Sequence, residues 1–151
     1  FDEFVYTTIM HKAYKKWLPY IAADLSTAGT LYRSAVRKVD SSWHNWYLII
    51  WNSHQVVEKS FKMIIVAKEL ELLKTHDLPR LVKLAQVEDA VFDDWKPLLA
   101  KLNDYYIEGR YPDTPLKKSY PRSNKEQAKE YLDLSKRIFI WAQELLSQKT
   151  R

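Results

Sequence analysis

The sequence predicts an all-α protein, an up-and-down bundle of four or five main helices. Several long segments repeat apolar residues at the 3.6-residue helical period, and none alternates apolar and polar residues as a strand does. Only two glycines occur, Gly29 and Gly109, whereas parallel α/β folds and phosphate-binding loops need glycines at tight turns. A chain of 151 residues suits one hydrophobic core, so we expect a single domain over residues 1–151.

The amino-acid composition excludes several classes of site chemistry. The chain has no cysteine, which excludes disulfides, Cys-ligated zinc and thiol catalysis and agrees with a reducing compartment. No secretory signal is visible and the longest apolar runs are too short to span a bilayer. The four histidines are too dispersed to specify a metal site. We therefore expect a cytoplasmic protein with no membrane association, no metal and no cofactor.

The first two predicted helices occupy the N-terminal quarter of the chain. Residues 1–18 carry an apolar stripe at helical spacing with lysines on the other side, and packing against a bundle explains this stripe better than a membrane surface does. Pro19 is predicted to open the next helix, because a proline at the first helical position loses no needed hydrogen bond. The apolar stripe of this second helix is Ile21, Leu25, Ala28, Tyr32, Ala35 and Val39.

A turn at residues 40–42 precedes a long predicted helix over residues 43–70. A shorter helix follows, with Asp77 as its N-cap and Pro79 in its first turn. The next helix is expected over residues 94–108, and Gly109 lies where a left-handed cap residue is common. The stripe of the long helix is Tyr47, Ile50, His54, Val57, Phe61 and Ile64.

Residues 110–122 contain three prolines and are predicted to form a loop. Ser123 to Glu126 match a capping box, in which a serine and a glutamate three residues later satisfy the first N–H groups of a helix. The final helix begins there. Its inward residues are expected to be Ala128, Tyr131, Leu132, Ser135, Ile138, Ala142 and Leu145.

Four segments, in this order, resemble the HEPN family (higher eukaryotes and prokaryotes nucleotide-binding): residues 23–25, 54–62, 74–78 and 110–113. The resemblance covers about residues 17–146 and leaves residues 1–16 as an extra N-terminal helix. It implies a bundle similar to the substrate-binding domain of certain nucleotidyltransferases, homodimerisation, and association with nucleotides. Members are often encoded beside small nucleotidyltransferases in toxin–antitoxin pairs, so the resemblance also implies a separate nucleotidyltransferase partner chain.

Some relatives are metal-independent ribonucleases, which carry an arginine followed shortly by a histidine late in the bundle. Here Arg110, Arg122 and Arg137 have no such histidine. Arg37 and His44 have a comparable spacing but lie across the first interhelical turn, and we interpret them as a coincidence. The sequence therefore favours nucleotide or RNA binding. A metal-independent ribonuclease toxin and a non-catalytic protein-interaction module are the alternatives.

Candidate binding residues stand on the long helix. His54, Glu58 and Lys62 follow one another at four-residue steps and line up along one helix edge. His54 also belongs to the apolar stripe, so we expect it to be buried with a hydrogen-bond partner, which Asp24 could supply. The structural alternative is a buried core histidine beside an ordinary helix ion pair. Two supporting residues flank the edge, Gln55 and Lys59.

The proline loop is the second candidate. Six basic and two acidic residues between positions 110 and 129 give a local charge of +4, out of +5 for the chain. Arginine holds phosphate bidentately and tyrosine stacks on bases, although a solvated loop explains the same composition. We interpret His76 and Asp77 as turn-packing and capping residues. The loop residues predicted to bind are Arg110, Tyr111, Lys117, Lys118 and Arg122.

Three tryptophans cluster near the start of the long helix, at positions 43, 46 and 51. A single core has no room to bury all of them. We expect some to cover a partner, because aromatic residues are enriched at protein interfaces. The sequence therefore predicts a homodimer.

Overall fold

The computed structural model describes residues 10–38, 46–108 and 123–147. Within these ranges the chain forms five α-helices and one 3₁₀-helix and no strand, so the predicted all-α helical bundle is confirmed. The elements in chain order are η1 (Lys12–Trp17), α1 (Leu18–Arg37), α2 (Trp46–Ala67), α3 (Leu78–Leu84), α4 (Trp95–Glu108) and α5 (Lys125–Ser147).

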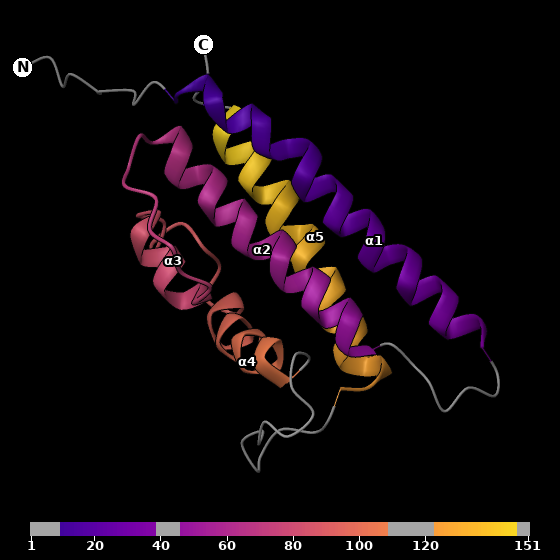
Figure 1. Ribbon diagram of the computed structural model, residues 1–151. Coiled ribbons are helices and arrows are strands. Elements are labelled where there is room, and N and C mark those ends of the chain that lie inside the picture. The colour runs from indigo at the N-terminus through magenta and orange to yellow at the C-terminus, as the bar shows by residue number, and fades with distance from the viewer. Residues whose placement is uncertain (1–9, 39–45, 109–122, 148–151) are drawn as a thin grey trace, which may run out of the picture.

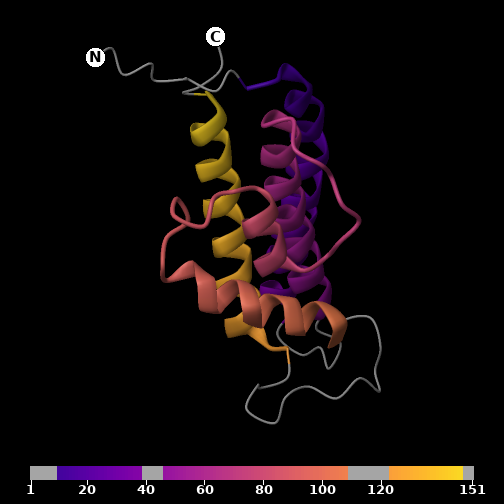
Figure 2. The same ribbon diagram turned by 90° about the vertical axis from the view of Figure 1, so that its left-hand side faces the viewer.

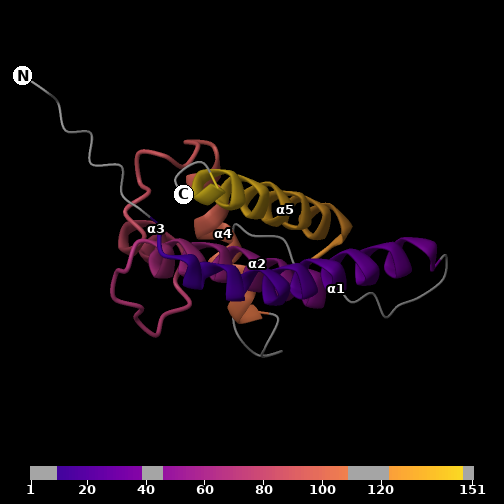
Figure 3. The ribbon, with the colours of Figure 1, turned by 90° about the horizontal axis from the view of Figure 1, so that it is seen from above.

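The three long helices α1, α2 and α5 lie side by side, with α2 and α5 running in one direction and α1 in the other (Figure 1). Seen from above, α5 lies over one side of the pair formed by α1 and α2 (Figure 3). The shorter helices α3 and α4 pack against α2, and α4 runs across the long helices (Figure 2). The backbone N–H of His11 donates to the carbonyl oxygen of Ala67 at 2.8 Å, which ties the first described residues to the end of α2.

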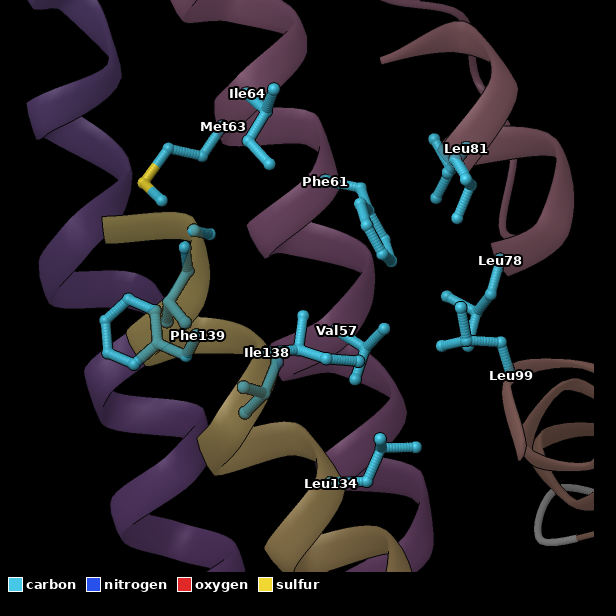
Figure 4. Packing of buried hydrophobic residues seen from close by; sticks show 14 of the residues in the cluster. Val57, Phe61, Met63, Ile64, Leu78, Leu81, Leu99, Leu134, Ile138 and Phe139 are labelled. Atoms are coloured by element: carbon cyan, nitrogen blue, oxygen red, sulfur yellow. The ribbon is translucent and has the colours of Figure 1, made fainter. Parts of the chain in front are cut away.

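Helix α2 is the centre of the core, because it is in contact with every other helix. Its residues Val57, Phe61 and Ile64 have no exposed surface. Figure 4 shows Phe61 directed toward α3, which carries Leu78 and Leu81. Since its neighbours surround it, α2 buries far more than the single apolar stripe that its sequence predicts.

From position 51 onward, the residues of α2 that keep partial exposure fall on one strip of the helix surface. This strip lies between α1 and the α3–α4 pair. We call it the open strip: Trp51, Gln55, Lys59, Lys62 and Val66.

The ends of the long helix differ in part from prediction. Tyr47, predicted to face the core, is 42% exposed. The helix ends at Ala67, three residues early, and Glu69 just beyond adopts a left-handed φ of 56°, a conformation common where helices end. Residues 43–45 lie outside the described ranges.

Of the helix predicted over residues 1–18, the structure has the part from Lys12 onward, as a 3₁₀-helix up to Trp17. Met10 and His11 are not helical. The imidazole Nδ1 of His11 accepts from the N–H of Ala13 at 3.1 Å and caps the short 3₁₀-helix η1. This helix continues directly into α1, which begins at Leu18, so Pro19 stands at the second position of α1, within one residue of the predicted helix start. Residues 1–9 lie outside the described ranges.

The helix caps agree with prediction at one site and differ at another. Asp77 caps α3 as predicted, and its Oδ1 accepts from the N–H of Arg80 at 3.2 Å. The predicted capping box is shifted by one residue, because Asn124 caps α5 and accepts from the N–H of Gln127 at 3.0 Å. Asparagine caps as well as serine, so the pattern permits both registers. Helix α4 matches the predicted range to within one residue, and Gly109 lies outside the described residues.

Candidate functional site

Glu58 stands at the centre of a polar cluster on α2, although it is only 3% exposed. Its Oε1 accepts from Lys62 Nζ at 2.7 Å and lies 2.8 Å from His76 Nδ1. Its Oε2 lies 3.5 Å from Gln55 Nε2 and 3.5 Å from His54 Nδ1. A carboxylate only accepts hydrogen bonds, so His76 Nδ1 is the donor. We call these five residues the Glu58 cluster.

His54 is sealed inside the protein, with no exposed surface. Its ring stacks on Tyr106 of α4 at a centroid distance of 4.0 Å, and its Nε2 lies 3.1 Å from Asn103 Oδ1. Burial away from water lowers the pKa of His54 from 6.5 to about 4, against the opposing effects of the Asn103 hydrogen bond and the Glu58 carboxylate. His54 is therefore neutral at neutral pH.

Asn103 fixes the tautomer of His54. Its Oδ1 also accepts from the backbone N–H of Leu78 at 3.1 Å, while its Nδ2 donates to Asp77 Oδ1 at 3.4 Å. These contacts assign the amide oxygen to the histidine side, so His54 Nε2 carries the hydrogen. One amide thus joins α2, α3 and α4.

Asp24, which was expected to be the hydrogen-bond partner of His54, pairs with Lys59 instead. Asp24 Oδ2 accepts from Lys59 Nζ at 2.6 Å, because α1 packs on the opposite side of α2 from α4. The pair is partly exposed, at 22% and 29% of the two side chains, so it contributes modestly to stability. The residue that sequence reasoning missed is Asn103. The signal was its place among Leu99, Leu102 and Tyr106, on the buried face of α4.

The ladder of ionisable groups reaches water only at its outer end. Exposure of the side chains rises from 0% at His54 and 5% at Glu58 to 15% at Lys62 and 61% at His76. Sequence reasoning treated His76 as a turn residue, but the structure includes it in the cluster. The predicted loop residues lie outside the described part of the chain: Arg110, Tyr111, Lys117, Lys118 and Arg122.

Replacing Asn103 with alanine should destabilise the protein by about 2 kcal/mol, because the N–H groups of Leu78 and His54 lose their acceptor. Chemical denaturation measures this change. Asn52→Ala is the matched control: Asn52 is buried too, but its amide only donates to the carbonyl oxygen of Leu48 one turn earlier. Its loss should remain below about 1 kcal/mol. Equal losses would contradict the role assigned to Asn103.

Within the described residues, no group of three or more histidine, aspartate or glutamate side chains is arranged to hold a metal ion. None of the helices described there has the length and apolar character needed to cross a membrane.

A family model, the HEPN domain, matches residues 24–145. The match covers most of the chain, the Glu58 cluster included, so the protein belongs to the HEPN family. The resemblance read from the four sequence segments is thereby confirmed. No curated protein and no solved structure matches the chain significantly.

Proposed function

We propose that this HEPN protein binds a nucleotide or RNA, and that Lys62 and His76 contact its phosphate groups. One observation carries the proposal: the nearly buried carboxylate of Glu58 fixes two nitrogen donors where the cluster meets water. Preorganised donors bind phosphate more favourably than free side chains, since less conformational freedom is lost on binding.

Lys62 keeps capacity for a ligand. A lysine ammonium has three N–H groups, and the hydrogen bond of Lys62 to Glu58 uses one of them. Because Glu58 balances the charge of Lys62, local affinity for phosphate depends on directed N–H groups rather than on net charge. The net positive charge that would attract a phosphate-bearing ligand comes from residues 110–122, a segment outside the described residues that has four basic residues and one acidic residue.

Replacing Lys62 with alanine should weaken the binding of ATP and of short RNA about tenfold at low salt, the loss of one charge-assisted hydrogen bond. Titration followed by fluorescence or calorimetry measures this, and His76→Ala should act in the same direction. Lys129→Ala is the matched control, because Lys129 also pairs with an acid four residues away but is 60% exposed on α5. No binding by the unaltered protein at low salt, where phosphate contacts are strongest, would refute the proposal.

The family also suggests partners. We propose a separate small nucleotidyltransferase chain, as in a toxin–antitoxin pair, and co-purification with such a chain tests it. Cleavage of RNA during the titrations would instead favour the metal-independent ribonuclease. Arg37 is exposed at the end of α1, while His44 lies outside the described residues. A cytoplasmic location stays a prediction.

A homodimer also remains a proposal. Trp46 packs against Tyr32 of α1 with ring centroids 6.3 Å apart, so the fold accounts for it within one chain. Trp51 keeps partial exposure on the open strip and supports a partner surface there. Trp43 lies outside the described residues. Light scattering at micromolar concentration would show the dimer.

A further inference from the structure

A cavity of about 280 Å³ lies between the start of α1 and the open strip of α2. It is lined by Lys16, Trp17, Tyr20 and Lys59. Three of these residues precede Asp24, where the match to the HEPN family begins. The cavity is therefore built largely from residues that precede the range matched by the family model.

Two aromatic side chains form its walls. Tyr20 is 68% exposed, and Trp17 is partly buried and packs against the core. They are three residues apart at the junction of η1 and α1, a spacing that makes side chains neighbours on a helix. Exposed aromatic rings of this kind are the platforms on which nucleic acid bases stack.

Two lysine side chains complete the lining of the cavity. Lys16 is exposed, and Lys59 is held at the cavity by the 2.6 Å hydrogen bond to Asp24. That bond uses one of the three N–H groups of Lys59. Lys62 follows three residues later on the same open strip, so its Cβ atom is roughly 5–6 Å from that of Lys59. Aromatic surface and nitrogen donors thus continue from the cavity to the Glu58 cluster.

We infer that this cavity holds the base of the bound nucleotide, with the phosphate reaching Lys59 and Lys62. The inference rests on the proposed function and adds the base-binding subsite to it. The volume is just below the roughly 300–1,000 Å³ of pockets for drug-sized ligands, which suits one ring system. An apolar helix of a partner fits less well, because it would remove the lysine ammonium groups from water.

The test compares two probes on the full chain, AMP and ribose 5-phosphate. Tyr20→Ala should weaken AMP about tenfold, the loss of one stacked base, and leave ribose 5-phosphate unchanged. Tyr20→Phe keeps the ring and should keep the affinity for AMP. Lys62→Ala should weaken both probes. Tyr20 is exposed, so these variants are expected to fold.

The outcomes separate the two proposals. If Tyr20→Ala leaves AMP binding unchanged while Lys62→Ala weakens it, the base subsite is refuted and the phosphate site stands. If the unaltered protein binds neither probe nor a short oligoadenylate, both proposals fail. If the oligoadenylate binds more tightly than AMP, the base in the cavity belongs to single-stranded RNA. Equal affinity of the two probes assigns the base to a free nucleotide. A Tyr20→Ala variant that loses only self-association would show a protein contact and refute the subsite.

Discussion

Acidifying the protein from pH 7 to pH 4 should lower its free energy of unfolding by about 3 kcal/mol through His54 alone. Burial lowers the pKa of this imidazole to about 4 in the folded protein, against 6.5 for the free side chain. Between these values the unfolded chain binds a proton that the folded chain does not, so stability falls as pH falls through this window. Each pH unit contributes up to about 1.4 kcal/mol.

Urea denaturation at a series of pH values measures this effect, and His54→Gln isolates it. The glutamine amide retains an N–H group for Asn103 but cannot titrate. We expect the unaltered protein to lose more stability than the variant between pH 6.5 and pH 4. Parallel curves for the two proteins would mean that His54 is protonated or hydrated in the folded state, and would contradict its sealed position beneath Tyr106.

The helices of this fold follow from its apolar periodicity, since a stripe at the 3.6-residue period must be buried. Of the six residues predicted to form the buried stripe of α2, five are buried and only Tyr47 is exposed. The N-terminal helix was predicted from an apolar stripe over residues 1–18, and half of that range, residues 1–9, lies outside the described residues. His11 caps a 3₁₀-helix over residues 12–17, and apolar periodicity alone does not distinguish such a helix from an α-helix.

The residues of the site on α2 could be predicted from the sequence, but their contacts on neighbouring helices could not. Spacing on one helix brought His54, Glu58 and Lys62 together, because that geometry is local. The spacing does not indicate which neighbouring helix lies on which side of α2. Because of this packing, His54 hydrogen-bonds to the amide of Asn103, and Asp24 accepts a hydrogen bond from Lys59. Contacts between elements depend on packing, which a single sequence leaves open.

Replacing Glu58 with alanine should destabilise the protein by about 3 kcal/mol. The change removes a nearly buried carboxylate and leaves Lys62 and His76 without their shared acceptor. Loss of one member of a buried ion pair costs about 3–5 kcal/mol. We expect the lower end of that range, because His76 is largely exposed and Lys62 is close enough to the surface for water to replace part of the interaction.

Asp133→Ala is the matched control for this loss. Asp133 and Lys129 also form an ion pair at four-residue spacing on a helix, but both side chains are 60% exposed, so its removal should change stability by less than about 0.5 kcal/mol. Similar losses of stability for the two variants would show that burial of Glu58 does not strengthen its contribution to the free energy of unfolding.

The same position distinguishes two roles of Glu58 in binding. If Glu58 only opposes an anionic ligand through its charge, Glu58→Gln should bind ATP more tightly than the unaltered protein. If Glu58 instead positions Lys62 and His76, the neutral amide holds them less firmly, because hydrogen bonds to a charged acceptor are about twice as strong. We expect weaker binding by Glu58→Gln, with a folded protein confirmed by circular dichroism. Tighter binding would assign the phosphate contact to other residues and leave the Glu58 cluster a structural role alone.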